Sequence, residues 1–396
     1  MYDDVSLEAF SLLSMQTPTL GQYPLPNLRS INWWIDSWDT VPFLRLFLNP
    51  ELASVQIVFP DDRPHPYLPA TISLIPTGEL THLQLEQMDD EDFRQDAFYD
   101  LLDGASGTLK SISLDRKLSV AIAEKILQLP HLRCLDTEMP EARISPPAVV
   151  FPSLEKLVVS YKEAGSWLHT LQNIPNPVLL ELEASFSGSS PIYLQTLGSS
   201  LLGASIERTL VSLECTSEGR IPLTEAGIRP LLSFGGLTKL NLFSACTTQR
   251  CNFQLNDFII SELAVALPRL RALSLGSSPC KVATPDVTVS SLVALSANCV
   301  DLDSLQLHFD ANDIVTRRSR TSSRTHKSTC KLRTLRVGSQ PLSSKHDDIL
   351  LVTFTILHIF PHLETILYTG GPWDRVKQGV QLFQKAPRII PIPTES

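Results

Sequence analysis

One stretch of the chain has the composition of a phosphate-binding loop. Gly104-Ala-Ser-Gly107-Thr-Leu-Lys110-Ser111 places two glycines ahead of a lysine and a serine. A true phosphate loop needs Gly, Lys and Ser or Thr to be contiguous, because the backbone N–H groups and the lysine must reach the same phosphates. Here Leu109 interrupts that order and, with Ile112, fits a repeated structural position described below. We therefore interpret this stretch as structural.

Two histidines and an acidic run have spacings that could bind a metal. His358 and His362 are four residues apart, the spacing of a helical metal pair, but Pro361 between them breaks a helix. The run Asp89-Asp90-Glu91-Asp92 precedes an expected helix through Phe98, Leu101 and Leu102, where acidic side chains favour the helix N-terminus; calcium binding is the alternative. Cys246 and Cys251 are close, yet no further Cys or His completes a zinc pattern.

No arrangement of a nucleophile beside a base is recognisable, and no Gly-x-Ser-x-Gly elbow is present. We expect no enzyme, no catalytic residue, no metal and no cofactor. The chain carries 33 Lys and Arg against 42 Asp and Glu, a formal net charge of −9. This acidic balance argues against nucleic acid and against anionic membrane surfaces as partners. The expected partner is a protein.

The expected compartment follows from the N-terminus and the cysteines. The first ten residues lack a basic segment followed by an apolar run, so no secretory signal is visible. The most apolar stretch, 349–360, is shorter than the roughly 20 residues that a membrane-spanning helix needs. Seven scattered cysteines without a Cys-x-x-Cys motif indicate reduced thiols. We expect a cytoplasmic or nuclear protein.

A repeat organises the whole chain, in which 63 of the 396 residues are leucine. The pattern Leu-x-x-(Leu/Ile/Val)-x-(apolar or small) recurs at intervals of 22 to 33 residues, close to the range of about 20–29 known for leucine-rich repeats. The leading leucines of the 13 copies are Leu28, Leu52, Leu80, Leu109, Leu132, Leu154, Leu179, Leu210, Leu237, Leu270, Leu302, Leu332 and Leu363.

Each copy predicts a short strand followed by a helix. The alternating apolar residues would occupy one face of the strand, and segments with helical periodicity lie between copies, as in 120–127, 258–267 and 291–295. Such units bury their apolar faces only against each other. The fold class is therefore predicted as an α/β leucine-rich-repeat solenoid, an irregular horseshoe with parallel strands on the concave side and helices on the convex side. We expect a cap at 1–25, the repeat domain at 26–384 and a tail at 385–396.

Three repeats carry a more specific pattern, namely 223–242, 255–275 and 292–307, the last with Cys299 three residues before its leading leucine. They resemble the cysteine-containing leucine-rich repeats of F-box proteins, the substrate receptors of SCF-type ubiquitin ligases. The stretch from about Leu25 to Ile390 is similar to the divergent F-box/leucine-rich-repeat proteins of mushroom-type fungi. The resemblance implies a ribonuclease-inhibitor-like fold and substrate selection for a ubiquitin ligase.

The sequence departs from this family in two respects. About 25 residues precede the first repeat, and they contain no F-box pattern, so binding of the SCF adaptor is expected only if an F-box or an equivalent exists. The ninth repeat position, where many leucine-rich repeats place an Asn that bonds neighbouring backbones, holds other residues. These are Asp36, Pro60, Met88, Lys117, Pro140 and Ser278, among others.

The third, fifth and seventh residues of each copy should point away from the helices, onto the surface that solenoids use for extended contacts. In copies three to eight these positions include seven Asp or Glu residues, and Lys156 is the one Lys or Arg among them. Adjacent strands would stack the carboxylates into a band that binds a basic segment of a partner; the alternative is a solvated face. The candidates are Glu86, Asp115, Asp136, Glu138, Glu181, Glu183 and Glu214. Trp34, at the same position in the first copy, is either an anchor for the partner or buried by the leading segment.

A basic, Ser/Thr-rich segment interrupts the array at about 311–329, where a helix should lie. Because it has no apolar stripe, we expect a mobile loop there. It is either a tolerated insertion, a nuclear-import patch or a phosphorylation loop with Ser319, Thr321, Ser322 and Ser323 as candidates.

The function that these observations favour is non-enzymatic protein–protein recognition, by resemblance as the substrate-binding region of an SCF-type ligase receptor. One alternative is a free-standing leucine-rich-repeat scaffold without a link to ubiquitin. Another is a regulator of small GTPases, although nothing singles out the exposed arginine that such an activity would use.

Overall fold

The computed structural model describes residues 23–35, 37–59, 68–86, 95–140, 142, 144, 153–161, 178–186, 193–217, 222–244, 253–276, 285–316, 328–338, 342–368 and 371–385. The chain forms two compact units, residues 1–180 and residues 181–396, and each is described by itself. The predicted solenoid region therefore contains two separately compact groups of repeats.

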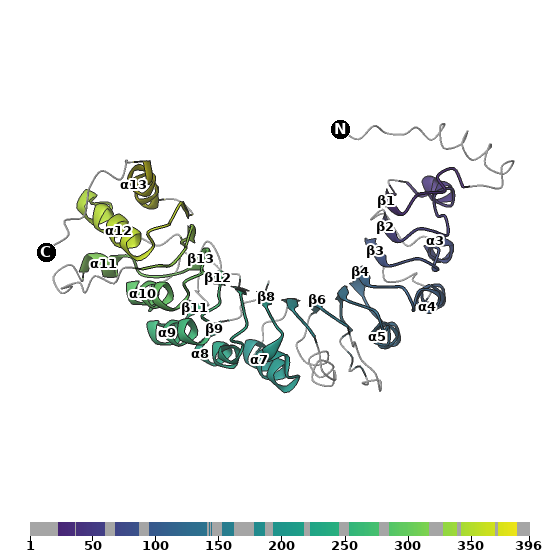
Figure 1. Cartoon of the computed structure of the whole chain (residues 1–396), viewed down its shortest axis with the longest axis horizontal. Helices are drawn as coiled ribbons and strands as arrows, with labels where there is room; N and C mark the ends of the chain where they lie inside the picture. Colours follow the sequence, from purple (N-terminus) through teal and green to yellow (C-terminus); the bar gives the residue numbers. More distant parts are fainter. Residues whose placement is uncertain are drawn as a thin grey trace. The chain divides into compact units, whose positions relative to one another are not determined.

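The first unit contains a parallel sheet whose strands follow each other in chain order. Among the described residues these are β1 (Ser30–Trp34), β2 (Ser54–Val58), β3 (His82–Glu86), β4 (Ser111–Lys117), β5 (Cys134–Glu138) and β6 (Lys156–Tyr161). The connections contain η2 (Trp38–Thr40), α2 (Val41–Leu44), α3 (Leu68–Leu74), α4 (Gln95–Gly104) and α5 (Val120–Leu127). These helices lie on one side of the strands (Figure 1).

The second unit repeats this arrangement with β7 (Glu181–Phe186), β8 (Ser212–Ser217), β10 (Lys239–Ser244), β12 (Ala272–Leu275), β13 (Ser304–Leu307), β14 (Thr334–Arg336) and β15 (Thr365–Leu367). Its described helices are α7 (Tyr193–Gly203), η3 (Ile206–Arg208), α8 (Glu225–Ile228), η4 (Arg229–Ser233), α9 (Asp257–Ala266), α10 (Val289–Asn298), α11 (Asn312–Thr316), α12 (His346–Ile359) and α13 (Trp373–Lys385). A small second sheet pairs β9 (Leu223–Thr224) with β11 (Phe253–Gln254).

The strands begin at the same point of every copy of the repeat. Each of the strands β1 to β8, β10 and β12 to β15 starts two residues after its leading leucine. A hydrogen-bond pattern accompanies this register: the carbonyl of Arg29 accepts from the N–H groups of both Ala53 and Ser54, at 2.8 and 3.0 Å. The same pair of hydrogen bonds from the next copy is accepted by the carbonyls of Ala53, Thr81, Lys110, Arg133, Val211, Thr238, Arg271, Asp303 and Arg333. The repeat in the sequence is thus a repeat in backbone bonding, and the α/β leucine-rich-repeat fold is confirmed.

The core of each unit lies between the strands and the helices. The leading leucines from Leu52 onward are at most 2% exposed, and the fourth residue of each copy is buried with them. At about 25 cal/mol per Å² of apolar area, this burial is the main stabilising contribution. The predicted helices at 120–127, 258–267 and 291–295 correspond to α5, α9 and α10, which confirms the assignment from helical periodicity.

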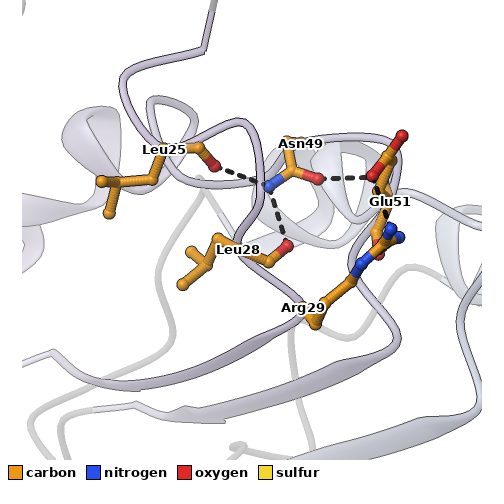
Figure 2. A network of polar contacts seen from close by, with 5 residues as sticks. All are labelled: Leu25, Leu28, Arg29, Asn49 and Glu51. Atoms are coloured by element: carbon orange, nitrogen blue, oxygen red, sulfur yellow. Dashed lines mark hydrogen bonds and ion pairs between the residues drawn. The ribbon is translucent and has the colours of Figure 1, made fainter.

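A buried asparagine joins the first two copies, although the ninth repeat position holds no Asn. Asn49 is 1% exposed, and its side-chain Nδ2 donates to the carbonyls of Leu25 and Leu28 at 3.1 and 3.0 Å (Figure 2). Its Oδ1 accepts from the Glu51 N–H at 2.8 Å, and Arg29 forms an ion pair with the Glu51 carboxylate. Asn49 lies three residues before a leading leucine, so inspection of the ninth position could not find it.

Other residue types make the equivalent bond in later copies. Thr108 Oγ1 donates to the Leu80 carbonyl at 2.8 Å, and Cys330 Sγ approaches the carbonyls of Cys299 and Leu302. Cys299 Sγ approaches two carbonyls of the preceding copy in the same way. Burial raises the pKa of the Cys299 thiol to about 12, so the thiol stays protonated and can donate. These cysteines are structural donors.

The region predicted as a loop at 311–329 begins as a helix, which corrects the prediction for its first residues. Asn312–Thr316 form α11, because Ala311 and Ile314 are buried and hold this turn against the core. The sequence argument missed this short apolar contact. Residues 317–327 lie outside the described residues.

The most apolar stretch of the chain forms most of α12, whose buried residues include Ile349, Val352, Ile356 and Ile359. Helix α13 packs beside it in the last copy. Within the described residues, no helix has both the length and the apolar character that crossing a membrane requires. Pro361 follows the end of α12, as the sequence predicted.

Candidate functional site

In each unit the described helices lie on one side of the strands, and we call the opposite side the open face (Figure 1). The third and fifth residues of each copy lie on it, together with those seventh residues that are not buried. Burial alternates along the strands as predicted: in β8 the side chains of Leu213 and Cys215 are buried, whereas those of Ser212, Glu214 and Thr216 are half-buried. The open face is therefore the accessible side of the strands.

In the second unit the fifth residues form one continuous row across the strands, which we call the central row. Each residue is the register partner of the next. Its members are Glu183, Glu214, Asn241, Ser274, Gln306, Arg336 and Leu367. The row passes from two carboxylates through uncharged polar groups to a guanidinium and an apolar side chain.

The acidic end of the central row lies on β7 and β8. Glu183 and Glu214 are directly opposed in register, and Glu181 is exposed at the start of β7. Lys239 on β10 places its Nζ 2.7 Å from a Glu214 carboxylate oxygen, and Asn241 Nδ2 donates to the same oxygen at 3.2 Å. This end of the central row is therefore acidic, and Lys239 and Asn241 hold the carboxylate of Glu214.

The cationic end of the row is Arg336, the last residue of β14. Its side chain is exposed, and its Nη1 donates to Gln306 Oε1 at 3.3 Å. Gln306 in turn donates from Nε2 to the Gly276 carbonyl at 3.2 Å, which fixes the orientation of the amide. Gly276 has φ of +92°, a left-handed conformation that favours glycine. This chain of bonds holds the guanidinium over the open face.

A hollow of about 460 Å³ lies along the central row between these ends. Its floor consists of small side chains, including Ala272, Ser274 and Ser304, and larger ones border it: Phe243 near the acidic end and Leu367 beyond Arg336. Phe243 and Leu367 are 39% and 36% exposed, respectively. The hollow thus offers apolar surface beside hydrogen-bonding groups, the usual composition of a recognition surface.

In the first unit the predicted acidic residues do not share one row, which corrects the expected continuous band. Asp136 has Ser113 and Val158 as register partners and accepts from Ser113 Oγ at 3.2 Å. A register shift in β4 between Leu114 and Lys117 leaves Asp115 exposed and outside the pairing. The sequence argument assumed an uninterrupted strand, and the irregularity displaces this carboxylate.

The same irregularity brings Lys117 opposite Glu138 in register, so a cation faces that carboxylate. Glu86, at the end of β3, accepts hydrogen bonds from Gln56 at 3.2 Å and Gln84 at 2.5 Å. The carboxylates of the first unit are therefore spread among amide, hydroxyl and ammonium groups.

Trp34 ends β1 and is 67% exposed on the open face of the first unit. Its register partner is Val58, whose own neighbour in the row is Glu86. The structure thus places Trp34 at the surface, where it remains a candidate anchor.

The residues first considered for metal or phosphate chemistry lie apart from this surface. Gly104 ends α4 and Ser111 begins β4, so the phosphate-loop-like stretch follows a helix C-terminus, the opposite of an anion site. His358 and His362 are both exposed, the second beyond the end of α12. In the part of the chain that the structure describes, no group of three or more His, Cys, Asp or Glu side chains is arranged to hold a metal ion.

Several predicted residues lie outside the described residues. These are the phosphorylation candidates Ser319, Thr321, Ser322 and Ser323, the acidic run 89–92, and Cys246 and Cys251.

One hydroxyl lies beside a histidine: Thr81 Oγ1 is 2.8 Å from His82 Nδ1. The Thr81 hydroxyl also donates its single proton to the Ala53 carbonyl at 2.8 Å, so it accepts from the histidine N–H. A histidine that donates to a hydroxyl is not its general base. This pair therefore has the chemistry of a surface contact.

Sequence reasoning missed Asn241, Gln306 and Arg336, which complete the central row. The positional rule that selected Glu181, Glu183 and Glu214 would have found them too, had it been carried beyond copy eight. The hollow itself has a signal in the small third and fifth residues of two successive copies, Ala272, Ser274 and Ser304.

Comparisons with known proteins add a structural similarity. No protein-family model matches the sequence, and no curated protein does. A solved structure, the leucine-rich-repeat-containing protein LegL7 from Legionella pneumophila, aligns with 90% of this chain and 98% of its own, at a TM-score of 0.37 and 11% sequence identity. The fold assignment rests on the chain's own repeat and strand order.

Proposed function

We propose that this protein is a non-enzymatic recognition module that binds a segment of a partner protein on the open face of its second unit. The hollow along the central row carries this proposal, because it combines apolar side chains, small residues and hydrogen-bonding side chains on successive paired strands. Solenoids use such faces for extended contacts, since each copy adds one set of outward side chains.

The chemistry of the surface supports binding rather than catalysis. The hollow is lined by Glu214, Asn241, Ser274, Gln306 and Arg336, together with apolar and small side chains. Among the polar side chains of this lining there is no cysteine or histidine. Glu214 is occupied by Lys239 and Asn241, and Arg336 is held by Gln306. These groups can position a ligand through hydrogen bonds and charge.

A variant that fills the hollow tests the proposal. Ser274→Trp places a large side chain on the floor, and Ala297→Trp, on the exposed side of α10, is the matched control. Cells expressing each full-length chain are treated with a cross-linker, and cross-linked peptides are identified by mass spectrometry. Partners cross-linked near the hollow should be lost with Ser274→Trp and retained with Ala297→Trp. Equal recovery from both variants would contradict the proposal.

We further propose, from the sequence resemblance to F-box/leucine-rich-repeat proteins, that the bound segment belongs to a substrate of an SCF-type ubiquitin ligase. The test is binding of the purified chain to the SCF adaptor protein, with an F-box protein as positive control. Association would support a receptor role for this chain. Absence of association would favour the free-standing scaffold.

A further inference from the structure

We infer that the segment bound on the open face of the second unit carries an Asp or Glu side chain that pairs with Arg336, about three positions from a large apolar side chain that enters the hollow. This inference rests on the proposed function and specifies the chemistry of the partner. It follows from the bonding of Arg336 and from the position of the hollow beside it.

Two described strands of the second unit carry a Lys or an Arg: Lys239 lies on β10 and Arg336 on β14. Lys239 pairs with the Glu214 carboxylate on the adjacent strand at 2.7 Å. The register partners of Arg336 are Gln306 and Leu367, and neither β13 nor β15 contains an acidic residue. The charge of Lys239 is therefore balanced by a neighbouring strand, whereas the strands beside Arg336 offer it no opposite charge.

Neutral groups orient the guanidinium of Arg336. The side chain is exposed, and its Nη1 donates to Gln306 Oε1 at 3.3 Å. Gln306 Nε2 donates to the Gly276 carbonyl at 3.2 Å, which fixes the amide that holds the arginine. The bond to Gln306 uses one of the five N–H donors of a guanidinium and does not neutralise its charge.

An anion is the group that this arrangement can bind. Within the described part of the chain, no ion pair joins Arg336 to a carboxylate. A planar guanidinium matches a carboxylate through two parallel hydrogen bonds, and such charge-assisted bonds are stronger than those between neutral groups. A partner that places an Asp or Glu over Arg336 therefore gains both charge and geometry.

The hollow favours a carboxylate over a phosphate group. Arg336 is the one Lys or Arg among the described residues that line it. A phosphorylated side chain carries a charge of about −1.5 to −2 at neutral pH, and clusters of Arg typically recognise it. A single guanidinium balances the single charge of Asp or Glu.

The hollow beside Arg336 fits an apolar side chain. Small residues from successive strands line it, including Ala272 and Ser274, and the exposed side chains of Phe243 and Leu367 border it. Its volume of about 460 Å³ is larger than any amino-acid side chain. Burial of an apolar side chain against Phe243 and Leu367 removes apolar surface from water and stabilises the complex.

The register sets the spacing between the two groups of the partner. Ser274, Gln306 and Arg336 are successive register partners, so Ser274 and Arg336 lie two strand intervals apart. At about 4.8 Å per interval, this distance is about 10 Å. An extended segment that crosses the strands advances about 3.3 Å per residue, so its acidic and apolar residues should be about three positions apart.

Selection from a displayed library of random dodecapeptides, with the full-length chain as bait, tests this pattern. Enriched peptides should carry Asp or Glu about two to four positions from a Phe, Leu, Ile or Met. Their binding is measured by fluorescence anisotropy with Arg336→Gln, which removes the charge. The matched control is Arg269→Gln, the same change at an exposed residue outside the hollow. Arg336→Gln is expected to weaken binding about tenfold or more, and Arg269→Gln less than about twofold.

A double-mutant cycle separates the ion pair from a structural effect of the variant. Replacing the acidic residue of the peptide with its amide should weaken binding to the wild type about tenfold. The same replacement should have little effect on binding to Arg336→Gln, because the partner of the carboxylate is already absent. Two losses that add independently would overturn the inference. Tighter binding of a peptide with phosphoserine at the acidic position would also overturn it, because phosphate would then be the preferred group.

The outcomes separate this inference from the proposed function. Peptides that lose binding with Ser274→Trp but carry no acidic residue near the apolar one would overturn the inference and leave the recognition surface in place. Peptides that bind equally to wild type and Ser274→Trp would overturn both. Enrichment of no peptide at all would also overturn both, because the proposed partner is a linear segment.

Discussion

Replacing Asn49 with alanine is expected to loosen the first copies of the repeat. Asn49 is 1% exposed and joins two successive copies through the carbonyls of Leu25 and Leu28 (Figure 2). It also accepts from the Glu51 N–H. Alanine removes both side-chain donors and the acceptor. The Leu28 carbonyl and the Glu51 N–H then lose this partner, whereas the Leu25 carbonyl keeps its bond from the Leu28 N–H at 3.1 Å.

The magnitude follows from these three bonds. A hydrogen bond contributes about 1 kcal/mol net, and a backbone group left without a partner costs a similar amount or more. Because the site lies near an end of the repeat array, water can reach some of the released groups. We expect a local loss of about 2–3 kcal/mol, which corresponds to an opening equilibrium roughly 30- to 150-fold more favourable.

Hydrogen exchange followed by mass spectrometry measures this opening locally, since exchange of protected amides reports the opening free energy. Peptides covering β1 and β2 should exchange roughly 30- to 150-fold faster in Asn49→Ala, and peptides covering β13 should be unchanged. Asn27→Ala is the control, because the Asn27 side chain is exposed and makes no hydrogen bond within the described structure. Acceleration below about threefold, or equal acceleration in the control, would refute the reasoning.

Three further predictions concern the second unit and its thiols. Burial raises the pKa of Cys299 to about 12, so a maleimide at pH 8 should label half-buried Cys134 faster than Cys299. Peptide mapping measures the labelling of each cysteine, and equal rates would contradict this prediction. Above a pH of about 8.5, the unfolded state loses the Cys299 thiol proton, whereas the folded state keeps it because its pKa is higher. Unfolding then releases a proton and becomes more favourable as the pH rises. The free energy of unfolding should fall as pH rises above about 8.5, more steeply than in Cys299→Ala; parallel denaturation curves would argue against it. Gly338→Ala should cost about 1–3 kcal/mol, because its Cβ would contact His308 Nδ1, whereas Gly235→Ala meets ordinary contacts at 3.6 Å; equal thermal shifts would be inconsistent with this.

Most of the fold could be predicted from the sequence because one position carries most of the burial. The leading leucine and the residues three and five positions after it identified each of the strands β1 to β8, β10 and β12 to β15, and these strands begin at one offset from that leucine. The prediction was wrong at 312–316, where buried Ala311 and Ile314 hold a helical turn that has no periodic stripe. Two apolar residues in a short turn do not give a helical period that a window of sequence could show.

The bonds between copies were less predictable. The sequence argument sought one residue type at one position, whereas the structure uses Asn49, Thr108 and Cys330 at different offsets to reach carbonyls of the preceding copy. The requirement is a donor at a point in space, and side chains of different length reach that point from different positions in the chain. A positional search finds such donors only after the backbone is known.

The candidate site, too, was predictable from the sequence only in part. The outward positions, and therefore Glu181, Glu183 and Glu214, followed from the two-residue period of a strand. Whether those carboxylates stack depended on the register: β7 and β8 pair without interruption, whereas a shift in β4 separates Asp115 from its expected neighbours. The hollow depended on small side chains from successive copies meeting on one surface.

The sequence by itself determined the repeat, the strand positions and the face on which each side chain lies. These features depend on a short-range periodicity that is present in every copy. Only the tertiary structure decided which charges are neighbours, that Lys239 reaches Glu214, and that Arg336 stands about four strand intervals from it. Those relations join residues 25 to 122 positions apart in the chain. They are set by the pairing of whole strands, and a pattern within one copy carries no information about them.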